Sequence, residues 1–142
     1  MSDVVLQVGV KVALQNSEGK ILLLKRSEEN YGKTKGTWDI VGGRIEAGTG
    51  LIENLRREAR EEAALEMSSE PRLIAAQDIV SDERHVVRIT YTAHTEGEPV
   101  LDTSENTAYQ WVTFDELKAQ EDLDTYVLAL IEAEQLTAAS WD

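Results

Sequence analysis

Cysteine is absent from the 142 residues of the chain. This absence excludes a disulfide framework, a thiolate metal site and a cysteine nucleophile. Long apolar runs are missing too: no stretch approaches the roughly 20 apolar residues that span a bilayer, and the N-terminal MSDVVLQVGV lacks a basic segment followed by such a run. We therefore expect a cytoplasmic protein with no membrane partner.

Positive charge is scarce. The chain has 14 Lys and Arg against 27 Asp and Glu, a net charge of -13. The negative electrostatic field of such a protein repels polyanions and disfavours a nucleic-acid partner. It also repels a nucleotide, unless divalent cations bound to carboxylates reverse the local potential. A small phosphorylated substrate would therefore imply a bound metal ion.

The remaining composition is that of a globular protein, with 42% hydrophobic and 29% charged residues, and the length favours a single domain over residues 1–142. Apolar periodicity predicts strands over 7–14, 21–24, 38–41, 73–76, 86–93 and 111–112, and helices over 51–66, 114–119 and 123–136. The first two strands should form a hairpin, residues 27–36 a loop, and Gly42-Gly43 a glycine-rich turn. This order predicts an α/β (α+β) fold in which helices flank a sheet on both sides.

Three glutamates of the predicted helix over 51–66 are spaced to share one of its faces: Glu58, Glu61 and Glu62. A like-charged pair four residues apart destabilises a helix by a few tenths of a kcal/mol, so a compensating cation is expected. Magnesium prefers oxygen ligands and is often bound by one or two carboxylates together with substrate phosphates. The flexible backbone at Gly43 could add a carbonyl ligand. Such a cation site would neutralise a diphosphate and lower the pKa of an attacking water.

Each feature alone also has an ordinary structural explanation. Glu53 and Arg57 are four residues apart, and so are Arg57 and Glu61. A helix with this spacing of opposite charges usually has only a charged face exposed to solvent. A pair of glycines before a helix is most often just a turn. It is the combination of the two features at a fixed spacing that points to a site.

That combination resembles the signature of the Nudix hydrolases, G-x5-E-x7-R-E-U-x-E-E-x-G-U, in which U is a bulky aliphatic residue. Six of its nine specified positions match, at Gly43, Arg57, Glu58, Glu61, Glu62 and Leu65. The resemblance extends to the predicted hairpin before the motif, to Trp38 ahead of the glycines, and to Trp111-Val112 followed by FDEL. It therefore covers nearly the whole chain.

The resemblance implies a Nudix α/β/α sandwich with a mixed central sheet, and a MutT-like hydrolase that cleaves a nucleoside diphosphate linked to a group X. The substrate would be a small nucleotide such as a nucleoside triphosphate or a nucleotide sugar, and the cofactor Mg²⁺, with Mn²⁺ as a substitute. By resemblance, Glu58 and Glu62 are the main metal ligands, Glu61 assists, and Arg57 orients the glutamates. Which carboxylate is the general base stays open, and the resemblance allows a homodimer.

Three positions depart from the signature, of which Ala59 is only a small version of the aliphatic residue. Thr49 stands where the signature has its first Glu, so Arg57 loses an expected partner, and Glu46 or Glu53 could replace it. Ala64 stands where a glycine normally ends the helix in a left-handed conformation, which would cost an alanine roughly 1 kcal/mol. We therefore expect the helix to continue towards Met67.

Further candidate residues lie outside the glutamate helix. Glu105, six residues before Trp111, is a candidate catalytic or metal-binding carboxylate, against the alternative of a plain surface residue. The candidate substrate-binding residues are Lys25, Arg26, Trp38, Arg44 and Glu46. Cations at a strand end are often simply exposed, and a tryptophan such as Trp38 equally fits a packing role.

The alternative function is a catalytically weak or inactive Nudix domain that binds a nucleotide as a sensor, a reading motivated by Thr49. The crowded glutamates argue against it, since a pure binder has little use for them. Isopentenyl diphosphate isomerase shares the fold but relies on a catalytic cysteine, which is absent here. RNA decapping is disfavoured because no basic tract is present to hold RNA.

Overall fold

The computed structural model describes residues 3–27 and 36–142, so most of the predicted 27–36 loop lies outside the described residues. The strands are β1 (Val5–Gln15), β2 (Ile21–Arg26), β3 (Trp38–Asp39), β4 (Val41–Arg44), β5 (Arg72–Val80), β6 (Arg84–His94) and β7 (Asn106–Val112). The helices are α2 (Leu51–Ala63), α3 (Phe114–Lys118) and α4 (Thr125–Glu132). No helix among these residues is long and apolar enough to cross a membrane.

The described strands form one mixed sheet. Its main order is β3-β2-β1-β6-β5, with β4 paired to β1 and β7 paired to β2. The parallel pair is β1 with β6, in continuous register from Val5 opposite Arg84 to Gln15 opposite His94, while the other pairs are antiparallel. The predicted hairpin exists, but β1 and β2 pair only at Gln15 and Ile21 before they diverge.

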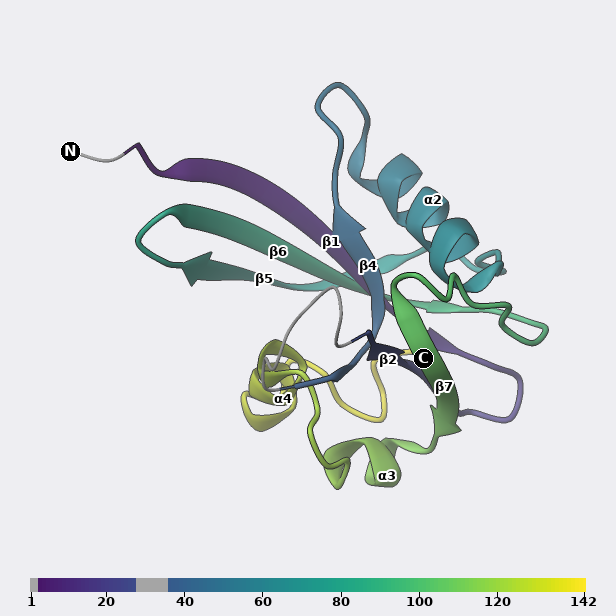
Figure 1. The fold of residues 1–142 in the computed structure, drawn as a ribbon. Coiled ribbons are helices and arrows are strands. Elements are labelled where there is room, and N and C mark those ends of the chain that lie inside the picture. The colour runs from purple at the N-terminus through teal and green to yellow at the C-terminus, as the bar shows by residue number, and fades with distance from the viewer. Residues whose placement is uncertain (1–2, 28–35) are drawn as a thin grey trace.

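Helices cover both faces of the sheet, with α2 on one side and α3 and α4 on the other (Figure 1). The two faces have separate cores, and β2 contributes to both because successive strand residues point in opposite directions. Leu22 and Leu24 pack in the core that includes α2, whereas Ile21 and Leu23 pack with α3 and α4. Full burial of each such side chain stabilises the fold by roughly 1.5–3 kcal/mol. The predicted fold class is confirmed.

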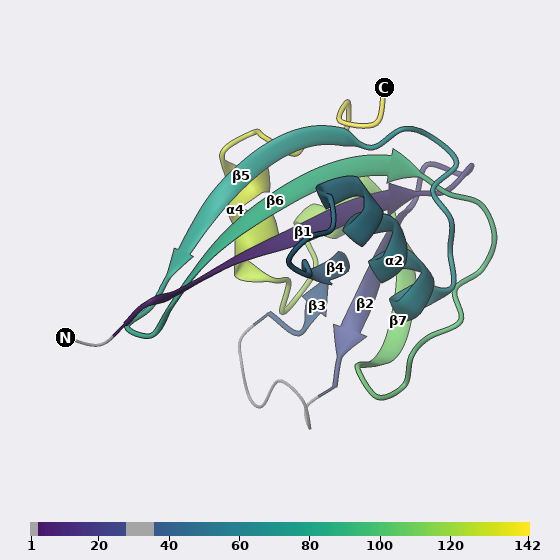
Figure 2. The same ribbon diagram turned by 90° about the horizontal axis from the view of Figure 1, so that it is seen from above.

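The far ends of β1, β5 and β6 extend beyond the helices as a curved three-stranded arm, seen from above in Figure 2. Hydrophobic side chains on this arm are exposed, namely Val4, Val5, Leu6 and Val80. The inner surface of the arm reaches towards the pocket described below, to which it contributes Ile79 and Val86.

Gly42 and Gly43 lie within strand β4, so the prediction of a turn at these residues was wrong. Gly42 pairs with Lys11 and Gly43 with Val10. Only glycine fits at position 42, because its φ is +151° and an added Cβ would lie 2.0 Å from the carbonyl oxygen of Val10. The glycine pair allows the β4 backbone to approach β1 closely.

The prediction that the first helix continues towards Met67 was also wrong. Helix α2 ends at Ala63, and Ala64 adopts the left-handed conformation with φ 54° and ψ 36°. The N–H of Ala64 donates to the Arg60 carbonyl at 2.9 Å and that of Leu65 to the Ala59 carbonyl at 3.2 Å, which satisfies the last carbonyls of the helix. The turn buries Leu65 against the core, and this burial offsets the cost of the alanine's conformation.

The last helix is shorter than predicted and covers Thr125–Glu132 rather than 123–136. Asp124 precedes it as the N-cap, and its carboxylate accepts from the N–H groups of Tyr126 and Val127 at 3.1 and 3.0 Å. Thr113 is the N-cap of α3, where Thr113 and Glu116 form a reciprocal capping box.

Candidate active site

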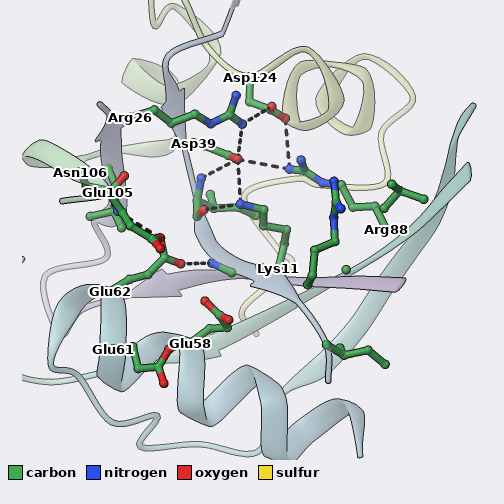
Figure 3. Close-up of a pocket in the computed structure, with 18 of the residues that line it drawn as sticks. Lys11, Arg26, Asp39, Glu58, Glu61, Glu62, Arg88, Glu105, Asn106 and Asp124 are labelled. Carbon is green, nitrogen blue, oxygen red and sulfur yellow. Dashed lines mark hydrogen bonds and ion pairs between the residues drawn. The ribbon is translucent and has the colours of Figure 1, made fainter. Parts of the chain in front are cut away.

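A cleft of about 680 Å³ lies between α2, strands β1 and β4, and the start of α4. Three of the four glutamates of α2 line it, namely Glu58, Glu61 and Glu62, as do Glu105 and Asn106 from the loop and strand that follow β6. Figure 3 shows the glutamates on one side of strand β4 and a network of ion pairs on the other. The cleft therefore has an acidic end and an end rich in cations.

At the acidic end, Glu62 is held on both sides. Its Oε1 accepts from the Gly42 N–H at 2.8 Å and its Oε2 from the Asn106 amide at 3.1 Å. Only 7% of the residue is exposed, and this burial raises the pKa of Glu62 to about 7, although the charge of Lys11 and the two hydrogen bonds oppose the rise. Glu62 is thus a buried carboxylate in a fixed orientation.

Glu58 lies one turn before Glu62 and faces the backbone of β4. A Cβ added at Gly43 would lie 2.8 Å from Glu58 Oε2, so the missing side chain leaves room for this carboxylate. Burial raises the pKa of Glu58, and ion pairing with Arg57 lowers it in part. Glu61 differs from both, because 62% of its side chain is exposed.

Arg57 connects the glutamates to the loop before the helix. Its Nη1 lies 2.7 Å from Glu46 Oε1, its Nη2 3.1 Å from Glu58 Oε1, and its Nε 3.8 Å from Glu61 Oε1. These partners raise the pKa of Arg57, against the opposing effect of burial. Of the two glutamates proposed to replace the signature's first Glu, Glu46 takes that place.

Thr49 fixes the same loop without a charge. Its hydroxyl donates to the Glu46 carbonyl at 2.7 Å and accepts from the Asn54 amide at 2.6 Å. Asn54 is fully buried, and its Oδ1 accepts from the Glu46 N–H at 3.1 Å. The threonine and asparagine together hold the backbone that presents Glu46 to Arg57.

The other end of the cleft contains a buried ionic cluster, which we call the cationic cluster and define as Lys11, Arg26, Asp39, Arg88 and Asp124. Asp39 pairs with Lys11 at 2.9 Å, with Arg88 at 3.2 Å and with Arg26. Asp124 pairs with Arg26 at 2.6 Å and with Arg88 at 3.1 Å. Burial alone would raise the pKa of Asp39, but the three cations outweigh it and hold that pKa well below its usual range.

Arg88 also lies beside the aromatic ring of Tyr126. Its guanidinium carbon lies 5.6 Å from the centre of the Tyr126 ring, within the range of a cation–π contact. Its Nε is buried and has no hydrogen-bond partner among the described residues. With Ile79 and Val86, this end of the cleft combines an aromatic ring with apolar side chains beside the guanidinium of Arg88.

Comparison with known proteins agrees with this geometry. The NUDIX domain model matches residues 5–130. The chain belongs to the NUDIX domain family. This result confirms the identification as a Nudix pyrophosphohydrolase that the spacing from Gly43 to Leu65 suggested.

Solved structures of other Nudix proteins share the fold. The MutT protein from Methanosarcina mazei Go1 has 24% sequence identity and a TM-score of 0.78, with 94% of this chain and 95% of that chain covered. A MutT NUDIX hydrolase from Burkholderia pseudomallei has 25% identity and a TM-score of 0.75, with 94% and 99% covered. The E. coli ORF135 protein has 23% identity and a TM-score of 0.75, with 92% and 89% covered. No curated protein matches the sequence.

The Nudix fold brings most of the candidate site residues to one cleft. Those that line it are Arg26, Gly43, Arg44, Glu46, Arg57, Glu58, Glu61, Glu62 and Glu105. Lys25 and Trp38 do not line it. Lys25 is exposed at the end of β2, and Trp38 packs with the core on the α3 and α4 side.

The carboxylates of the Nudix cleft are a donor set of the kind that the expected magnesium ion prefers. Among residues 3–27 and 36–142, no three carboxylate or imidazole side chains are gathered closely enough to hold an ion by themselves. Two carboxylates one helical turn apart nevertheless line the cleft: the partly buried Glu58, which occupies the space that the missing Gly43 side chain leaves, and the buried Glu62. One or two carboxylates plus substrate phosphates is the usual environment of Mg²⁺, so these residues fit the ion.

Several cleft residues could not be assigned from the sequence: Lys11, Asp39, Arg88, Asn106, Asp124 and Tyr126. Two signals were available. Lys11 interrupts the valines of the first strand, and Arg88 interrupts the apolar residues of the strand over 86–93. Because charged residues are seldom buried without partners, such positions indicate an ionic cluster, although not its members.

Proposed function

We propose that the chain is a magnesium-dependent hydrolase that cleaves the phosphoanhydride bond of a nucleoside diphosphate linked to a group X, such as a nucleoside triphosphate or a nucleotide sugar. The observation that carries this proposal is a single cleft with the glutamates of α2 at one end, Glu62 buried among them, and the cationic cluster at the other. A nucleotide has matching parts, a polyphosphate that takes divalent cations and a planar base with polar edges.

The acidic end fits the diphosphate. Glu58 and Glu62 would hold the ion, with Mn²⁺ as a substitute, and Glu61 would assist from its more exposed position. A bound cation would neutralise the diphosphate and lower the pKa of an attacking water. Arg57 would keep Glu58 in place, and Glu105, close enough for its charge to raise the pKa of Glu58, is the candidate general base.

The cationic end fits the nucleoside. Three cations face two carboxylates there, so the cluster carries one net positive charge. The Tyr126 ring and the apolar Ile79 and Val86 offer a surface on which a base can lie. Arg26 of the cationic cluster and Arg44 both line the cleft and are suited to contact phosphate.

The alternative is a Nudix domain that binds a nucleotide without turnover, motivated by Thr49. The ion pair between Glu46 and Arg57 counts against it, because Arg57 retains a carboxylate partner in spite of the threonine. Hydrolysis is therefore the favoured proposal.

The test is phosphate release, after a coupling phosphatase or pyrophosphatase, across a panel of nucleoside triphosphates and nucleotide sugars with and without magnesium. Native protein is compared with Glu62→Gln and with the matched variant Glu53→Gln, which changes an exposed glutamate of the same helix outside the cleft. Magnesium-dependent turnover that only Glu62→Gln abolishes supports the proposal. Nucleotides that raise the melting temperature without any turnover would support the sensor instead.

A further inference from the structure

Asn106 is the first residue of β7 and is buried beside the acidic end of the cleft. Its amide nitrogen donates to Glu62 Oε2 at 3.1 Å, across 44 residues of sequence. We propose that Asn106 is a positioning residue that holds Glu62 in the orientation needed to bind the divalent cation. This inference rests on the proposed function, since Glu62 is taken there as a metal ligand.

The contact with Asn106 fixes Oε2, the carboxylate oxygen of Glu62 that the Gly42 backbone does not hold. The Gly42 N–H holds Oε1 at 2.8 Å, so without Asn106 the carboxylate could rotate about its last bond and swing Oε2 out of the cleft. With both contacts, each oxygen is held by one donor. A carboxylate oxygen accepts about two hydrogen bonds or ligands, so each oxygen retains one site for a cation.

A neutral donor suits this task better than a charged one. Lysine or arginine at position 106 would also orient Glu62 but would neutralise it and compete with the metal ion. The amide of Asn106 orients the carboxylate and leaves its charge available. The contrast lies one turn away, where Arg57 binds Glu58 directly.

Asn106 is itself held in place. Its N–H donates to the Asp102 carbonyl at 3.0 Å, and the neighbouring Glu105 carbonyl accepts from the Ser27 N–H at 2.8 Å. The pairing of β7 with β2 shifts register between Lys25 and Arg26, where Asn106 stands opposite Arg26. Beyond this irregularity both Glu105 and Asn106 line the cleft, although they are adjacent in sequence.

The experiment measures Mn²⁺ binding to the full chain by electron paramagnetic resonance, which needs no turnover. Four proteins are compared: native, Asn106→Leu, Glu62→Gln and the double variant. Leucine has the same branching as asparagine and no donor, although it is larger. Melting temperatures in EDTA report on the fold of each protein, and Asn106→Ala replaces Asn106→Leu if the leucine variant fails to fold.

Loss of an outer hydrogen bond to a metal ligand typically weakens metal binding about 10–100-fold. We expect that loss for Asn106→Leu in the native background, and less than about a twofold change when Glu62 is already Gln. An equal loss in both backgrounds would show that Asn106 does not act through Glu62 and would overturn the inference, as would unchanged Mn²⁺ affinity in Asn106→Leu.

The same measurements separate this inference from the proposed function. If native protein binds Mn²⁺ and Asn106→Leu weakens that binding in the expected pattern, yet no nucleotide is hydrolysed, the role of Asn106 is supported and the hydrolase proposal fails. If nucleotides are hydrolysed but Asn106→Leu leaves Mn²⁺ affinity intact, the hydrolase proposal stands and the role of Asn106 is refuted. Native protein that binds no Mn²⁺ refutes both.

Discussion

Glu46 Oε1 lies 2.7 Å from Arg57 Nη1, and this ion pair joins the loop before α2 to the arginine beside Glu58. The glutamate stands three residues before Thr49, the position where the Nudix signature has its first Glu. Thr49 and the buried Asn54 hold the loop backbone that presents it. The departure at Thr49 therefore moves the partner of Arg57 along the loop without removing it.

If Glu46 is the working partner of Arg57, Glu46→Gln should lower kcat about tenfold, because Arg57 would be less well held against Glu58. A glutamate restored at the signature position by Thr49→Glu should recover part of that loss in the Glu46→Gln background. Steady-state kinetics on the substrate found in the panel measure both effects. Glu53→Gln is the matched control, and an equal loss in that variant would contradict the assignment.

The buried Asp39 balances the buried Arg88 and the partly buried Lys11 and Arg26, so Asp39→Asn should be strongly destabilising. Removal of one partner from a buried ion pair typically costs about 3–5 kcal/mol, because the remaining charges are left uncompensated. Chemical denaturation at pH 7 measures the loss. Asp115→Asn is the control, since Asp115 pairs with Lys118 at 3.5 Å with 93% of its side chain exposed, and its change should stay within about 0.5 kcal/mol. Similar losses in both variants would argue against the buried network.

Ala64→Gly should stabilise the protein by about 1 kcal/mol. The alanine adopts a left-handed conformation with φ 54°, which glycine reaches without steric cost. The change in the free energy of unfolding is measured by denaturant titration. Ala133→Gly, at the corresponding position after α4 but with φ -84°, should destabilise slightly instead. A loss of stability in Ala64→Gly would mean that helix α2 continues past Ala63 in solution.

The raised pKa of Glu62 predicts a pH-dependent stability in the metal-free protein. A carboxyl group whose pKa rises from 4.5 to about 7 on folding favours the folded state when protonated, so its contribution is complete below pH 4.5 and is lost as pH rises through 7. In EDTA, Glu62→Gln should match native stability near pH 4.5 and exceed it at pH 8 by up to roughly 3 kcal/mol. Thermal unfolding across this range measures the difference, and parallel curves for the two proteins would contradict the raised pKa.

The glutamate face of α2 could be predicted from sequence because it depends on contacts within one helix. Glu58 and Glu62 are four residues apart, and helical periodicity alone places them on the same side. The end of the helix could not be predicted in this way. Local propensity favours continuation through Ala64, while burial of Leu65 in the core decides for the turn.

The cationic end of the cleft lay beyond such inference, because its partners are distant in sequence. Arg26 and Asp124 are 98 residues apart, and no local pattern links them. Asn106 is similar: in sequence it is one polar residue of a loop, and its role appears only when β7 lies beside β2 and across from Glu62. Features that depend on packing between distant segments of the chain could therefore be identified only from the structure.

The parallel pairing of β1 with β6 also governs the order in which the chain can fold. Eleven residues near the N-terminus have their main partner at Arg84–His94, while β5 and β6 are neighbours joined by a short turn. The β5–β6 hairpin closes a small loop and can form early, whereas the pairing of β1 with β6 closes a much larger loop. During synthesis β6 is complete only when about two-thirds of the protein has been made, so the β1–β6 pair forms late. A fragment that stops before Arg84 contains the whole glutamate helix but not the central strand pair of the sheet that supports it.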